Sequence, residues 1–146
     1  MMGRSSILYV PSLFLLGSMI LPAQPHVVSE RTARKLVQEA LTRLGATGPS
    51  VQIMHWQYEW APEFYTFQAW RPNPGNGPLL TYYFAVNPWT GDVWDAIGCE
   101  RITSPALEKE QESIFRRAHL SADRQKALSE KSPGCSEIET KSQGKR

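Results

Sequence analysis

The sequence contains few of the residues that build catalytic or cofactor sites. It has two cysteines and three histidines in 146 residues, and no two histidines share a metal-ligand spacing. The HExxH, CxxC, GxSxG and glycine-rich phosphate-binding motifs are all missing. We therefore predict no metal, no cofactor and no enzymatic activity, and we keep an enzyme of unrecognised type as the least favoured alternative.

The sequence also lacks an excess of charge of either sign. Sixteen basic and 14 acidic side chains give a formal net charge of +2, whereas nucleic-acid-binding domains usually carry a clustered basic face. Nucleic acid is therefore not an expected partner. With 41% hydrophobic and 21% charged residues, the composition is typical of one soluble domain with tails.

Residues 7–23 form an uncharged apolar segment that follows Arg4 and ends at the small residue Ala23. A basic start, an apolar stretch and a small residue before the polar Gln24 are typical of a secretory signal. An uncleaved membrane anchor is the alternative, but the segment carries Pro11 and Pro22 and is shorter than the roughly 20 residues that span a bilayer. We predict a signal peptide at 1–23 and a periplasmic or extracellular protein, which contacts the membrane only if the signal stays uncleaved.

Both cysteines follow this signal. An oxidising compartment would let Cys99 and Cys135 pair across the 35 intervening residues, and two unrelated thiols are the alternative. A disulfide would tie the C-terminal segment to the domain.

The order of elements predicts an α+β fold. From Glu30 to Leu44, apolar residues recur at helical spacing after the N-cap Ser29 and before Gly45. Strand-forming segments, a helix that begins after Ser104 and a charged segment follow. We predict an N-terminal helix packed on an antiparallel sheet of about four strands, with an appended C-terminal helix, in one domain over 24–120 and a flexible tail over 121–146. The predicted strands cover 51–60, 64–70, 79–86 and 93–97, and Met54, Trp56, Tyr58 and Trp60 are expected to face the core.

Twelve of the 15 aromatic residues lie between Trp56 and Trp94, within the predicted sheet. Core packing is the expected role of Trp56 and Trp94. Trp89 lies in the middle of a tight turn, where burial is hard to arrange, so we predict an exposed contact residue. With Trp60 and Trp70 at strand ends, Trp89 would form an aromatic rim for a peptide or a glycan.

The turn 86–93 carries a family resemblance. It reads Val86-Asn-Pro-Trp-Thr-Gly-Asp-Val93, which resembles the Val-Asp-x-x-Thr-Gly-x-Val turn of PepSY domains with Asn for Asp. Together with the helix-then-sheet order, the similarity extends over about residues 29–97. The resemblance implies a bacterial envelope protein that binds or inhibits a protein or peptide partner, such as a secreted peptidase, without catalysis.

A second function class stays open. In an immunity-type or NTF2/cystatin-like protein, a helix packs on a curved sheet and a pocket holds a toxin or a small ligand. His55 and Glu59, on the polar face of the first predicted strand, would line that pocket, although the solvated side of a sheet is the favoured interpretation of these two residues. A deep cavity would favour this class, and a flat sheet crossed by one helix would favour PepSY.

Overall fold

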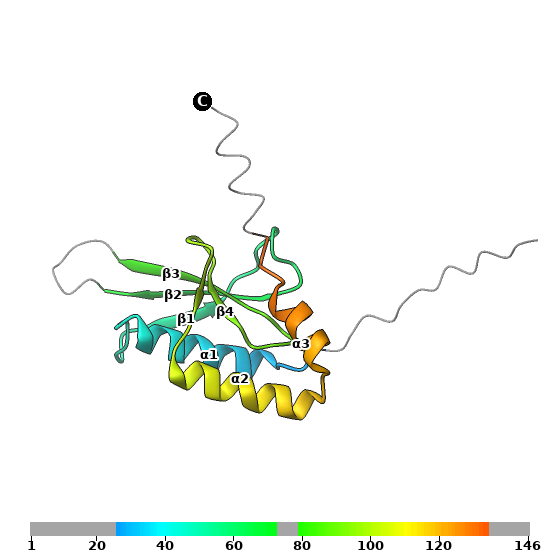
Figure 1. The fold of residues 1–146 in the computed structure, drawn as a ribbon. Helices are drawn as coiled ribbons and strands as arrows, with labels where there is room; N and C mark the ends of the chain where they lie inside the picture. The colour runs from blue at the N-terminus through cyan, green and yellow to red at the C-terminus, as the bar shows by residue number, and fades with distance from the viewer. Residues whose placement is uncertain (1–25, 73–78, 135–146) are drawn as a thin grey trace, which may run out of the picture.

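The computed structural model describes residues 26–72 and 79–134. Within these residues the chain forms three helices and one five-stranded antiparallel sheet with the strand order β1-β2-β3-β4-β5 (Figure 1). The predicted α+β fold, with a helix on each side of the strands in sequence, is confirmed. In chain order the elements are α1 (Glu30–Arg43), β1 (Gln52–His55), β2 (Tyr65–Arg71), β3 (Leu80–Val86), β4 (Val93–Asp95), β5 (Glu100–Ile102), α2 (Pro105–Ala118) and α3 (Ala122–Ser129).

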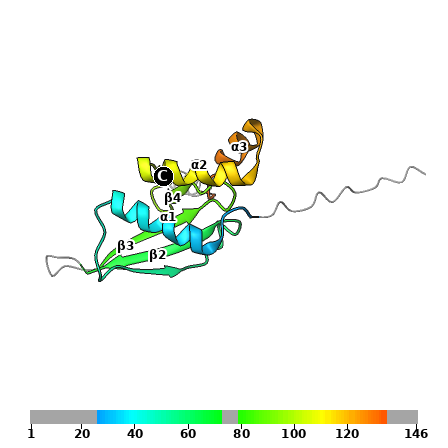
Figure 2. The same cartoon turned by 90° about the horizontal axis from the view of Figure 1, so that it is seen from below.

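The domain has two main layers. Helices α1 and α2 lie side by side over the same face of the sheet, as Figures 1 and 2 show from two directions. The core lies between these helices and the sheet, and no described helix covers the opposite face, which we call the helix-free face. None of the described helices is long and apolar enough to cross a membrane. The core includes Leu36, Val37 and Leu41 from α1, Phe67, Phe84 and Val93 from the strands, and Leu107 and Ile114 from α2.

Helix α1 forms as its sequence predicts. The Ser29 hydroxyl accepts a hydrogen bond from the Thr32 N–H, which satisfies one of the free donors of the first turn. At the other end Gly45 adopts the left-handed φ of 67° that ends the helix. The apolar stripe is buried from Ala33 to Leu41, but Leu44, its last predicted member, is 45% exposed.

The first strand is shorter than predicted and faces the other way. Regular pairing with β2 ends at His55, and the chain then leaves the sheet. Val51 and Ile53 pack against the core, whereas Met54 and Trp56 are 43% and 46% exposed. The predicted burial of Met54 and Trp56 is therefore wrong. The helices cover the face that carries Val51 and Ile53, and no described helix covers the opposite face.

The domain extends beyond residue 120, where the charged composition predicts that a flexible tail begins. Ser121 caps α3, and Leu128 within this helix is 2% exposed. The Asn87 amide donates a hydrogen bond of 2.8 Å to the Leu128 carbonyl, which joins α3 to the turn between β3 and β4. The predicted signal at 1–23 and the end of the predicted tail, residues 135–146, lie outside the described residues.

Gly91 provides a test of this packing. Its φ is 74°, and a Cβ there would lie 2.6 Å from Ile114 Cδ1 and 3.2 Å from Leu36 Cδ1. We expect Gly91→Ala to lower the free energy of unfolding by roughly 2–4 kcal/mol, because left-handed strain adds to overpacking between two helices. Gly45→Ala is the matched control, since its φ of 67° is similar but no atom lies within 4 Å of the added Cβ. Equal losses in urea denaturation would contradict close packing at Gly91.

Candidate functional site

Side-chain and backbone hydrogen bonds hold the turn between β3 and β4. The Asn87 side-chain oxygen accepts hydrogen bonds from the N–H groups of Trp89 and Thr90, at 2.9 and 3.2 Å. The Thr90 hydroxyl donates to the Asp92 carboxylate at 2.7 Å. All residues from 87 to 92 are buried, so the motif that resembles PepSY turns serves the interior of this domain.

Other elements bond to the outside of the same turn. The N–H groups of Val27 and Val28, just before α1, donate to the Pro88 carbonyl at 3.0 and 2.9 Å. The Gln111 side chain of α2 donates to the Gly91 carbonyl at 3.3 Å. With the Asn87 bond to α3, the turn holds the N-terminal segment and both C-terminal helices.

Trp89 is not the exposed contact residue that its position predicts. Only 8% of it is exposed. The His26 ring meets it edge-on with centroids 5.4 Å apart, and the Lys131 ammonium lies 4.7 Å from the ring centroid, within cation–π range. Lys131 also forms a 3.0 Å ion pair with Glu63. Segments from both ends of the described chain cover this indole. The sequence of the turn by itself does not indicate these contacts.

Trp60 and Trp70 are half-buried, and the structure does not bring them together with Trp89 as one rim. Trp70 pairs in register with Thr81 near the start of β3, whereas the turn that carries Trp89 follows the end of β3. Trp60 stacks on Tyr58 with centroids 4.8 Å apart. The predicted three-residue rim is therefore wrong in geometry, and the binding roles of Trp60 and Trp70 remain predictions.

The helix-free face is instead the aromatic surface of the sheet. Alternation along the strands directs to this face the side chains of Met54, Trp70, Tyr83 and Trp94, opposite core positions such as Ile53, Phe67 and Phe84. Two polar atoms of this region, the Tyr58 hydroxyl and Trp94 Nε1, are buried without a hydrogen-bond partner in the described structure. Burial, with smaller contributions from Tyr83 and Asp95, raises the pKa of Tyr58, so this hydroxyl stays protonated at physiological pH.

The predicted pocket with His55 and Glu59 forms only in part. His55 lines a hollow of about 250 Å³ with His26, Pro62 and Tyr65, but Glu59 is not among its lining residues. His55 Nδ1 lies 3.8 Å from a Glu30 carboxylate oxygen, and both side chains are half exposed. His55 therefore faces α1 rather than a partner carboxylate on its own strand.

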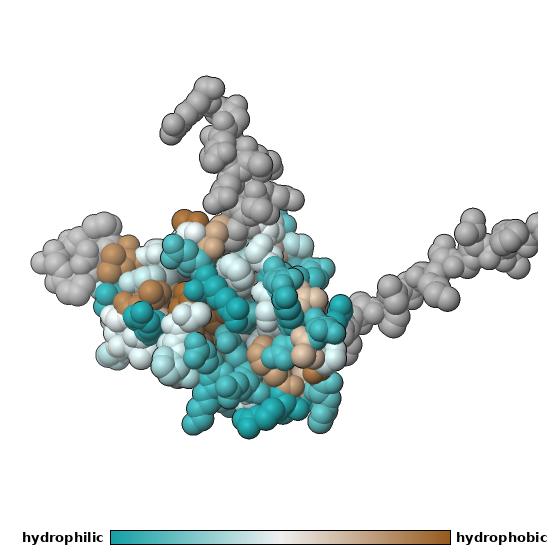
Figure 3. All heavy atoms as spheres, viewed as in Figure 1, coloured by the Kyte–Doolittle hydropathy of each residue, from teal (hydrophilic) through white to brown (hydrophobic). Residues whose placement is uncertain are grey.

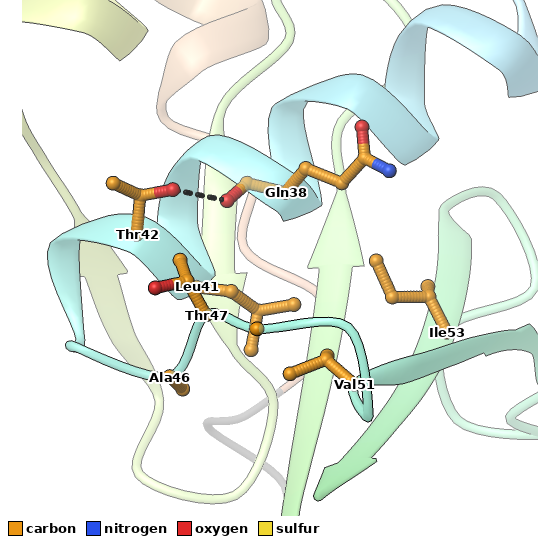
Figure 4. Close-up of a pocket in the computed structure, with 8 residues that line it drawn as sticks. Gln38, Leu41, Thr42, Ala46, Thr47, Val51 and Ile53 are labelled. Carbon is orange, nitrogen blue, oxygen red and sulfur yellow. Dashed lines mark hydrogen bonds between the residues drawn. The ribbon is translucent and has the colours of Figure 1, made fainter.

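Other hollows are of similar size. One of about 170 Å³ lies between the end of α1 and β1, where Leu41, Val51 and Ile53 line it and the Thr42 hydroxyl donates to the Gln38 carbonyl at 3.0 Å (Figure 4). Another of about 380 Å³ lies beside Trp89 and Lys131. Small-molecule sites usually measure 300–1,000 Å³, so these hollows are at or below the lower end of that range. Among the described residues, no group of three or more His, Cys, Asp or Glu side chains could hold a metal ion.

Asp92 is the most deeply buried carboxyl of the site. Its side chain is fully buried and forms an ion pair with Arg101 of β5, whose side chain is 38% exposed. Burial raises the pKa of Asp92 above its ordinary value of 3.8, although the Thr90 hydroxyl, the Arg101 charge and Ser129 oppose this rise. The ion pair joins the turn to the edge strand β5.

Comparisons with known proteins show a shared fold. No family model matches the chain, and no curated protein matches its sequence. The structure is similar to a chain in a solved type VI secretion system effector–immunity complex from Pseudomonas protegens, with a TM-score of 0.56 and 24% sequence identity. The match covers 70% of this chain and 87% of that chain. The PepSY resemblance of the turn stays a prediction.

The raised pKa of Asp92 leads to a pH prediction. The folded protein binds this proton more tightly than the unfolded chain, so the stability that Asp92 contributes is greatest below the ordinary pKa of 3.8 and is lost as the pH rises through the higher pKa of the folded state. We expect urea titrations to show that the difference in unfolding free energy between wild type and Asp92→Asn shrinks as the pH rises from the ordinary pKa of Asp92 to its pKa in the folded state. In Arg101→Met the loss of the cation would extend the decline to higher pH. A difference that does not vary with pH would contradict this assignment.

The predicted disulfide can be tested by thiol titration. Cys99 directly precedes β5 with a left-handed φ of 56°, and Cys135 lies outside the described residues, so the pairing stays a prediction. We expect the unfolded, unreduced mature protein to show no thiol and the reduced protein to show two. Cys135→Ser should release one thiol and lower the free energy of unfolding by roughly 3–4 kcal/mol. Two thiols in the unreduced wild type would rule the bridge out.

Proposed function

We propose that this chain is an exported immunity-type protein that binds a protein toxin and blocks its action without catalysing a reaction. The observation that carries the proposal is the fold shared with a chain of an effector–immunity complex, over most of both chains. The exposed surface is also suited to a protein partner, because the hollows are small and large apolar side chains lie open to solvent. The exposed ones are Val27, Leu44, Met54, Trp56, Leu79 and Ile97.

A role as a peptidase regulator, which the PepSY resemblance implies, has less support. The turn that carries the resemblance is buried, and its polar groups bond to other parts of the domain. It therefore offers no contact surface to a peptidase. Because hydrogen bonding and close packing already account for the Asn87 and Gly91 positions, the motif does not require a common function.

The predicted signal at 1–23 defines where protection would act. An exported immunity protein would meet a toxin that reaches the periplasm, before the toxin attacks its target there. The small net charge of +2 gives no strong long-range steering, so we expect apolar contacts to dominate recognition of the toxin.

A contact-dependent competition assay tests this function. We delete this gene, and any second copy of it, in the bacterium that carries it. We expect the wild-type parent to inhibit the deletion strain when the two grow in contact. A parent without a working type VI secretion system should cause no inhibition, because it delivers no effector. The full-length chain should restore resistance, whereas the chain without residues 1–23 should not, because it stays in the cytoplasm. Survival of the deletion strain equal to wild type would overturn the proposal.

A further inference from the structure

Among the residues that the structure describes, strand β3 has no partner along one edge of its first half. All seven residues of β3 pair with β2, but β4 pairs only with Phe84, Ala85 and Val86. Beyond them, the Ala96 N–H donates to the Tyr83 carbonyl at 2.8 Å and the chain then leaves the strand. Figure 1 shows β2 and β3 continuing past β4.

The hydrogen-bond pattern identifies which backbone groups lie at this edge. Because the Tyr83 carbonyl points toward β4, the N–H and C=O of Thr81, two residues earlier, point the same way. Neither group has a backbone partner in the described part of the chain. Asp95 causes the early end of β4, since its carboxylate accepts the N–H groups of Ile97 and Gly98, at 2.9 and 3.1 Å, and reverses the chain.

Apolar side chains gather around the same edge. A hollow of about 310 Å³ lies against it, between the end of α1 and the β4–β5 turn, and its lining includes Leu44, Tyr82, Phe84 and Ile97. Leu44, Leu79 and Ile97 are 45%, 60% and 68% exposed, so three of the six exposed large hydrophobic residues in the described part of the chain are neighbours of one strand edge. Apolar residues are also prominent beside the start of β3 on the face that Figure 3 shows.

We propose that this edge of β3 binds an extended segment of the toxin as an additional β-strand. This proposal rests on the immunity function proposed above. Unpaired backbone groups beside an apolar hollow are what strand addition requires: main-chain hydrogen bonds supply affinity, and alternate side chains enter the hollow. A helix or a flat protein surface would leave the Thr81 N–H and C=O unsatisfied. An extended strand satisfies both.

The negative charge of Asp95 indicates that the added strand carries a basic residue. The Asp95 carboxylate lines the hollow and forms no ion pair with a described residue. Asp95 pairs in register with Phe84, so its side chain lies on the same face of the sheet as the apolar lining. A strand that carries an apolar residue and a lysine or arginine two positions apart, and so on one face, fits both features, because the apolar residue contacts Leu44 and Ile97 while the cation reaches Asp95.

Binding of the purified mature protein to the effector that inhibits the deletion strain tests the mode of contact. We expect Thr81→Pro, which removes the edge N–H, and Ile97→Glu to weaken binding at least about tenfold. Thr81→Val keeps the N–H and should bind as wild type. Met54→Glu, on the helix-free face at β1, should also bind as wild type. In the complex, amide exchange at Thr81 and Tyr83 should slow at least about tenfold.

Each alternative outcome has a distinct meaning. If Met54→Glu loses binding while Thr81→Pro retains it, the effector docks on the helix-free face, and the strand proposal is overturned while the immunity function stands. If the chain alone is a dimer that Thr81→Pro dissociates, the edge belongs to a second copy, which also overturns the proposal. Thermal unfolding of each variant shows whether it is folded.

A synthetic peptide tests strand addition at β3 without the effector, and therefore independently of the immunity function. A short capped peptide that carries valine and lysine in turn at every second position, with threonine between them, should shift the amide signals of Thr81, Tyr83 and Ile97 in nuclear magnetic resonance spectra and leave Met54 unchanged. This result supports strand addition even where no effector inhibits the deletion strain. Shifts confined to Met54 and Trp56, or no shifts, would count against it.

Discussion

The hydrogen bonds of the Asn87 side chain are the interaction on which the rest of the structure depends. Its oxygen closes the tight turn by accepting two backbone N–H groups, and its nitrogen reaches the end of α3. A buried turn would otherwise leave main-chain groups unsatisfied, which costs free energy comparable to a lost hydrogen bond for each group. Because these groups are satisfied internally, helices and the N-terminal segment can pack over a turn that would normally face water.

This arrangement explains which parts of the fold the sequence predicts. Helical spacing from Ala33 to Leu41 and the Ser29 cap are local signals, and the structure agrees with them. The boundary after residue 120 depends on nonlocal contacts. α3 has one buried residue, Leu128, and a single apolar position in a charged segment carries no periodic signal. Its partner, the Asn87 amide, lies 41 residues earlier.

The same reasoning applies to the candidate site. The aromatic concentration marks the sheet correctly. Strand periodicity alone cannot say which face the helices cover, so it predicts burial for Met54 and Trp56, which are exposed. Trp89 looks exposed in a turn considered by itself, yet His26 and Lys131 cover it. The open edge of β3 has no sequence signal beyond Asp95, whose carboxylate ends β4 two residues before the exposed Ile97.

The covering of Trp89 from two directions also constrains how the domain reaches its native state. His26 precedes the first helix and Lys131 follows the last, so both ends of the described chain converge on a residue near its middle. Contacts between residues so far apart in sequence require the closure of long loops, which slows folding. Docking of the two ends onto the β3–β4 hairpin covers the indole of Trp89, which passes from water into a covered site and so reports on that docking.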